Sequence, residues 1–142
     1  MNLSQADVIQ LELPANHKYL NILSACLSAL LERVEGLVEP TMLIYSVQLA
    51  LQEACANIVD HAYSGQTGGR IEVTFTIEPF PRRLTIDLHD TGQPFEPEAV
   101  PAPDLDEVQV HGYGLFLMRT LLDEATYQSL PGHNYWHLVK NL

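Results

Sequence analysis

The chain has 142 residues, 46% of them hydrophobic, which is the size of one compact domain with an ordinary core. Its 18 acidic and 7 basic residues give a formal net charge of -11, which disfavours DNA, RNA or anionic lipid as a partner bound through bulk electrostatics. The first residues lack a basic leader and no apolar run approaches about 20 residues, so we expect a single cytoplasmic domain over residues 1–142 that does not contact a membrane.

Hydrophobic periodicity predicts a strand followed by two helices in the first part of the chain. Residues 8–14 alternate apolar and polar side chains, as in a strand with one buried face. Residues 17–35 and 41–62 carry apolar side chains at three- and four-residue steps, which indicates two amphipathic helices. Gly36 is placed to end the first helix, and the sequence SGQTGG ends the second.

The second half predicts two hairpins separated by a loop and a helix. Residues 70–78 and 83–89 alternate in the same way around PFPR, which is typical of an antiparallel hairpin. The acidic, proline-containing stretch up to residue 111 is expected to be a surface loop, with a lid over residues 96–111. A helix should follow over residues 112–122. The last two strands are expected in ATYQSL and NYWHLVK.

These elements predict an α+β fold. Four to five strands form a mixed, mostly antiparallel sheet in a two-layer α/β sandwich, with helices on one face. The other face of the sheet would be exposed or used for pairing.

A polar stripe runs along the otherwise apolar helix 41–62. Glu53, Asn57, Asp60 and His61 recur at steps of three and four, so their side chains share one face. A solvated face is the commoner explanation of such a stripe. The functional alternative is that Asn57 offers a neutral oxygen to Mg²⁺, while Glu53, one turn earlier, accepts a proton from a hydroxyl that attacks a terminal phosphate.

The triplet Asp90-Thr91-Gly92 follows an apolar strand and allows three interpretations. An aspartic-protease half-site needs a second carboxylate, and the chain has only one such triplet, so a second copy would have to supply it. A base-binding Asp would accept a hydrogen bond from an exocyclic amine, with Gly92 allowing a flat ring to approach. A simple Asx-type turn needs no ligand, and for the triplet alone it is the simplest interpretation.

Gly112 and Gly114 open the predicted helix that ends near Leu122. Bare backbone N–H groups at a helix N-terminus can bind a phosphate. Two glycines can equally well just end a loop before a core helix.

Taken together and in this order, the three segments resemble the ATP-binding domain of the GHKL superfamily, and most closely the small bacterial anti-sigma-factor serine/threonine kinases. QEACANIVDHAY resembles their N box, DTGQPFEP their first glycine box and HGYGLFLMRTLLDEATY their second. The resemblance runs from about Thr41 to the C-terminus, and the preceding strand and helix fit the same single-domain layout.

The resemblance implies a role for each matching residue. Asn57 would coordinate Mg²⁺, and Glu53 would be the catalytic base. The adenine would lie at Asp90 and Gly92. The phosphate end, beneath the lid 96–111, would be lined by His111, Gly112 and Gly114. ATP and Mg²⁺ are the implied cofactors, and the implied partners are an anti-sigma-factor antagonist, a sigma factor and a second copy of the chain.

Four positions depart from the pattern of that family. Pro94 stands where many members have a second glycine, and His111 where glycine or serine is usual. His133 and Asn134 stand where a threonine often meets the nucleotide. Because these changes gather at the phosphate end, an alternative function is a catalytically weak or inactive nucleotide-binding module that regulates by sequestering a protein.

Overall fold

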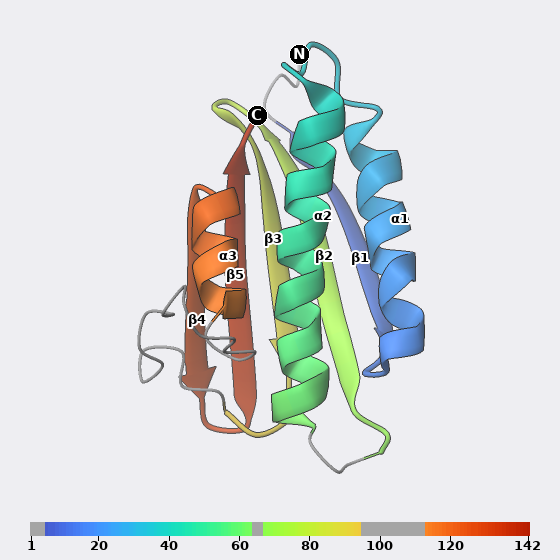
Figure 1. Ribbon diagram of the computed structural model, residues 1–142, viewed down its shortest axis with the longest axis vertical. Helices are drawn as coiled ribbons and strands as arrows, with labels where there is room; N and C mark the ends of the chain where they lie inside the picture. The colour runs from blue at the N-terminus through green and yellow to red at the C-terminus, as the bar shows by residue number, and fades with distance from the viewer. Residues whose placement is uncertain (1–4, 64–66, 95–112) are drawn as a thin grey trace.

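The computed structural model describes residues 5–63, 67–94 and 113–142 (Figure 1). The predicted lid 96–111, with His111 and Gly112, lies outside the described residues. The strands are β1 (Asp7–Pro14), β2 (Arg70–Pro79), β3 (Arg82–Asp90), β4 (Glu124–Leu130) and β5 (His133–Asn141). The helices are α1 (Leu20–Leu31), α2 (Pro40–Asn57) and α3 (Tyr113–Leu121), with the short turns η1 (His17–Tyr19) and η2 (Ile58–Ala62).

The five strands form one sheet in the order β1-β2-β3-β5-β4. Every neighbouring pair of these described strands is antiparallel. The three helices lie on one face of the sheet (Figure 1). The predicted α+β two-layer fold is therefore confirmed, although the observed sheet is antiparallel throughout rather than mixed.

The core lies between the sheet and the helices. On β3 the side chains of Leu84, Ile86 and Leu88 are buried, while the intervening side chains, apart from buried Thr85, are partly exposed. Helix α2 covers the sheet with a fully apolar stripe made of Val47, Ala50, Leu51, Ala54 and Cys55. The stretch Pro40–Ala62 is long and apolar enough to span a bilayer by length and composition alone. This differs from the expectation that no apolar run approaches about 20 residues. In the structure 33% of the apolar window is buried, and the apolar stripe of α2 is part of the core.

Both predicted helices of the first half differ from the structure at their ends. The helix expected over residues 17–35 begins with the 3-10 turn η1 and ends at Leu31. The N–H groups of Arg33 and Val34 bond three residues back instead of four, to Leu30 O at 3.1 Å and Leu31 O at 3.0 Å. The helix expected over residues 41–62 changes at Ile58 into a π-helical turn. Tyr63 N donates to Ile58 O at 3.2 Å, five residues earlier.

That π-helical turn positions the rest of the site. A π turn inserts an extra residue into a helix and changes the direction of the side chains and carbonyls that follow, and such turns are frequent at functional sites. In this chain it lies directly after Asn57. It brings the carbonyl of Ala62 against the end of β3, where Asp90 and Gly92 lie.

Candidate functional site

The three sequence segments meet at one end of the molecule. The C-terminal half of α2, the end of β3 and the N-terminus of α3 all lie toward the lower end of the view in Figure 1. Helices α2 and α3 pack against each other. Residues that are far apart in sequence therefore share one region on the helix-covered face of the sheet.

Glu53 and Asn57 of α2 lie directly against Gly114 of α3. A Cβ added to Gly114 would lie 3.1 Å from Glu53 Oε2, 3.3 Å from Asn57 Nδ2 and 3.7 Å from Asn57 Oδ1. Gly114 is buried, and the two polar side chains are half-buried. The glycine thus leaves room for a carboxylate oxygen and an amide oxygen next to the start of a helix. Oxygen donors of this kind suit Mg²⁺.

Gly92 fits equally closely against the end of α2. A Cβ added there would lie 2.3 Å from Ala62 O and 2.8 Å from Ala62 Cβ. The next residue, Gln93, donates its backbone N–H to Ala62 O at 2.7 Å. Only glycine allows the loop after β3 to approach this backbone, so the Asp-Thr-Gly segment packs directly against the end of the helix.

Asp90 is a buried carboxylate held from two sides. It is 3% exposed. Its Oδ1 accepts the backbone N–H of Gly92 at 2.9 Å and a side-chain N–H of Asn134 at 2.8 Å. Within the part of the chain that the structure describes, both of these bonds end on Oδ1, so Oδ2 is the oxygen that remains for a ligand. The bond to Gly92 is the Asx-type turn considered above, so the turn is present and is compatible with a binding role.

Burial has an electrostatic consequence for Asp90. Desolvation raises the pKa of this carboxyl above its ordinary value, and the hydrogen bonds from Asn134 and Gly92 oppose that rise. His133 and His89 also act to lower the pKa of Asp90. A carboxylate balanced in this way can accept a hydrogen bond from an amine inside a pocket.

Two residues of the site, Asn134 and Tyr63, were not predicted as site residues from the sequence. Asn134 was noted only as a departure from the family pattern. Its side chain is 2% exposed, and it donates to Gly92 O at 2.9 Å as well as to Asp90. Tyr63 is buried, and its hydroxyl accepts the N–H of Thr91 at 2.9 Å and donates to Arg70 O at 2.9 Å. The signal that could have identified Asn134 is its position two residues before Trp136, which makes it a polar residue on the buried face of the last strand.

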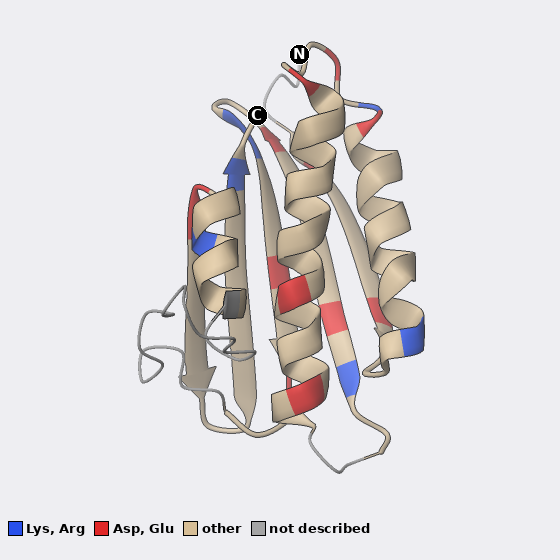
Figure 2. Cartoon of the chain, in the orientation of Figure 1, with Lys and Arg blue, Asp and Glu red and all other residues tan. Residues whose placement is uncertain are grey.

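The predicted polar stripe of α2 divides into two parts. Asp60 is exposed, and its Oδ1 lies 2.7 Å from His17 Nε2 in a surface ion pair. The solvated-face interpretation therefore applies to Asp60. Glu53 and Asn57 instead face α3 through Gly114. The acidic positions of α2 and η2 both lie in the lower half of this helix in Figure 2.

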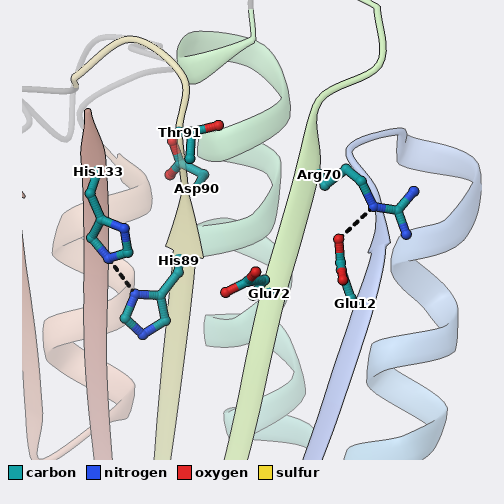
Figure 3. Close-up of a pocket in the computed structure, with 7 residues that line it drawn as sticks. All are labelled: Glu12, Arg70, Glu72, His89, Asp90, Thr91 and His133. Atoms are coloured by element: carbon teal, nitrogen blue, oxygen red, sulfur yellow. Dashed lines mark hydrogen bonds and ion pairs between the residues drawn. The ribbon is translucent and has the colours of Figure 1, made fainter.

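A separate cavity of about 250 Å³ opens near the end of β3 (Figure 3). It is lined by Glu12, Arg70, Glu72, His89, Asp90, Thr91 and His133. Cross-strand partners share a face of the sheet, and the pairs Glu12–Glu72 and Glu72–His89 place these side chains on the face opposite the helices. Most of this cavity is therefore separated by the sheet from Glu53 and Asn57.

The comparisons with known proteins agree with the fold described above. A model of the histidine kinase-like ATPase domain family matches residues 13–140. A serine-protein kinase RsbW of Bacillus velezensis is 31% identical over 137 residues, which cover 91% of this chain and 82% of that protein. The RsbW of Bacillus subtilis is 30% identical with the same coverage. The crystal structure of the RsbU and RsbW domains of Rv1364c from Mycobacterium tuberculosis is similar with a TM-score of 0.70 and 19% identity, over 96% of this chain and 32% of that one, and shows the shared fold.

Proposed function

This chain belongs to the histidine kinase-like ATPase domain family, and we propose that it is an ATP-dependent serine/threonine protein kinase. Its protein substrate would be an anti-sigma-factor antagonist, and in its other state it would sequester a sigma factor. The relatives that cover most of the chain are named serine-protein kinases, which supports this activity. The observation that carries the proposal is the convergence of Glu53 and Asn57 on Gly114, beside the buried Asp90 segment.

The adenine end of the proposed nucleotide site is the loop after β3. Asp90 Oδ2 would accept a hydrogen bond from the exocyclic amine of adenine. Gly92, whose missing side chain makes room for Ala62, would lie beside the ring. Guanine presents a carbonyl oxygen at the same position. Two acceptors would then face each other, so the site should prefer adenine to guanine.

The phosphate end is the contact between α2 and α3. Asn57 would hold Mg²⁺ through its amide oxygen, and Gly112, Gly114 and His111 would line the phosphates at the N-terminus of α3. The bound ion would neutralise part of the charge on the phosphates. Glu53, one helical turn from Asn57, would accept the proton of the attacking serine or threonine hydroxyl. The segment 96–111 would serve as the lid over this end.

The proposed partners are proteins rather than nucleic acid or lipid. A formal net charge of -11 opposes binding to a polyanion. We expect a homodimer in the cytoplasm that binds a sigma factor and an antagonist protein at different times.

The test is phosphoryl transfer with γ-labelled Mg-ATP to candidate antagonist proteins. Wild type should label a serine or threonine, and Glu53→Gln should still bind ATP but lose at least about a hundredfold in transfer rate. Glu32→Gln is the matched control, an acid-to-amide exchange at the exposed end of α1. A Glu53→Gln variant as fast as wild type would remove the base from the proposal.

The departures at Pro94 and His111 favour one alternative, a nucleotide-binding module that sequesters a protein without transferring phosphate. His133 and Asn134, also expected at the phosphate end, instead lie beside His89 and Asp90, at the proposed adenine end. In that case wild type would bind ATP and retain a sigma factor on a column, and no antagonist would become labelled. Turnover that depends on Glu53 would exclude this alternative.

A further inference from the structure

The side chain of Asn134 connects three residues at the proposed adenine end of the site, Asp90, Gly92 and Gln93. From β5 it donates to Asp90 Oδ1 at 2.8 Å, to Gly92 O at 2.9 Å and to Gln93 O at 3.3 Å. One side-chain amide thus holds a carboxylate and two carbonyls of the loop that follows β3. Asp90 and Asn134 are also direct cross-strand partners, so their side chains share the helix-covered face of the sheet.

The orientation of this amide is set by a third strand. Ser129 of β4 donates its hydroxyl to Asn134 Oδ1 at 3.0 Å. Because the amide oxygen is occupied by that donor, the amide nitrogen must face Asp90 and Gly92. The chain of donors runs from Ser129 through Asn134 to Asp90, across β4, β5 and β3.

We propose that Asn134 is a positioning residue that sets the purine specificity of the nucleotide site. By donating to Asp90 Oδ1 from a fixed direction, it keeps the carboxylate an acceptor and turns Oδ2 toward the exocyclic amine of adenine. By bonding Gly92 O and Gln93 O, it also keeps the loop at the distance that a flat ring requires. This inference rests on the proposed nucleotide-binding function and adds the residue that selects the base.

The physical reason is the cost of a buried charge. A protonated Asp90 would be a donor, and it would then match the carbonyl oxygen of guanine instead of the amine of adenine. Burial favours that protonated form by raising the pKa of Asp90, and the Asn134 hydrogen bond works against it. The other groups that stabilise the charged form are the Gly92 N–H, His133 on β5 and His89 on β3. Loss of Asn134 should therefore weaken adenine binding and weaken the discrimination against guanine together.

The experiment is a calorimetric titration of ATP and GTP, each with Mg²⁺, into wild type, Asn134→Ala, Asn134→Asp and Ser129→Ala between pH 5.5 and 8. Gln128→Ala is the matched control, since Gln128 is the adjacent β4 residue and pairs with Tyr135 on the other face of the sheet. Circular dichroism and thermal unfolding report whether each variant folds. Ser129→Ala leaves the buried residues unchanged and keeps the test informative if an Asn134 variant does not fold.

We expect Asn134→Ala to lose about tenfold or more in ATP affinity, because a hydrogen bond to a charged group is lost. The ATP-to-GTP affinity ratio should fall as well, and the pH below which ATP binding weakens should rise. Asn134→Asp, which adds a second acid beside Asp90, should show the same changes more strongly. Ser129→Ala should show them more weakly, and Gln128→Ala should match wild type.

The results separate the two proposals. If wild type binds neither nucleotide, the proposed function fails and this inference fails with it. If wild type prefers ATP while Asn134→Ala and Ser129→Ala keep the same ATP-to-GTP ratio and the same pH profile, Asn134 has only a structural role. In that case this inference is overturned and the nucleotide site stands.

Discussion

Gly114 of α3 lies against Glu53 of α2 so closely that a Cβ on the glycine would be 3.1 Å from Glu53 Oε2. Gly114 has an ordinary helical position, without the positive φ that favours glycine elsewhere in the chain. Space for Glu53 and Asn57, rather than backbone conformation, therefore explains why the residue is glycine.

The first prediction is that Gly114→Ala separates activity from stability. Alanine is favoured over glycine in a helix by up to about 1 kcal/mol, so the free energy of unfolding should stay near that of wild type or rise. The added methyl group would displace the Glu53 carboxylate, and a shift of this kind can cost on the order of a hundredfold in rate. Urea denaturation and phosphoryl-transfer assays on the same preparation would measure both. A fully active Gly114→Ala variant would contradict the proposed position of Glu53.

Gly92→Ala should behave in the opposite way, because its added Cβ would meet backbone. The added Cβ would lie 2.3 Å from Ala62 O. A shift of β3 or of the π turn away from it would break the hydrogen bond from Gln93 N to Ala62 O. Overpacking of this kind costs about 1–3 kcal/mol or more. The midpoint of urea unfolding should fall clearly below that of Gly114→Ala, whose methyl group meets side-chain atoms only. Equal midpoints for the two variants would show that the loop after β3 is not fixed to the helix.

The locally patterned parts of this fold could be predicted from the sequence. The alternation in residues 70–78 and 83–89 correctly predicted the β2–β3 hairpin, because one buried face imposes a period of two on each strand. The polar residues Glu53 and Asn57 could be identified for the same kind of reason. They are four residues apart, which is about one helical turn, so two polar side chains share one face of an otherwise apolar helix.

The parts that depend on long-range packing could not be predicted. β5 inserts between β3 and β4, so Asn134 reaches Asp90 from 44 positions along the chain, and no local period encodes that contact. The π turn after Asn57 was also missed, since its residues have ordinary helical periodicity. The π turn is stabilised by a tertiary contact, because the redirected carbonyl of Ala62 accepts the backbone N–H of Gln93.

Asp90→Asn should bind ATP poorly without losing stability. The amide oxygen can still accept the bonds from Gly92 and Asn134, while the buried charge, whose cost is seen in the raised pKa of Asp90, is removed. Because that pKa is raised, the folded state holds the proton more strongly, and the full cost of the charge is present above the folded pKa. The free energy of unfolding without nucleotide should equal or exceed that of wild type.

ATP affinity of the same variant should fall at least about a hundredfold, since an amide N–H would face the amine of adenine. Asp87→Asn is the matched control, because Asp87 is on the same strand but contacts His137 on the other face of the sheet. Calorimetry and urea unfolding measure the two quantities. Retained ATP binding by Asp90→Asn would show that the carboxylate does not contact the base.

We expect the pair His89 and His133 to make the stability of the fold sensitive to mild acid. His89 Nδ1 lies 2.6 Å from His133 Nε2, so one ring must donate and the other accept. Burial lowers the pKa of His89 below its ordinary value, and His133 lowers it further, while Asp87, Glu72 and Asp90 oppose the shift. A second proton on the pair would replace the hydrogen bond with a repulsion between like charges.

The sign of the effect follows from proton linkage. Between the lowered pKa of folded His89 and the ordinary value of 6.5, the unfolded chain binds more protons than the folded one. The contribution of His89 to the free energy of unfolding is therefore fully present above about pH 6.5. It declines as the pH falls below that value. Urea unfolding at pH 8, 6.5 and 5.5 should show this decline in wild type and a shallower one in His89→Gln. His133→Gln should also flatten the profile, because it removes the neighbouring ring that lowers the pKa of His89. Parallel pH profiles for all three proteins would show that other groups cause the acid sensitivity.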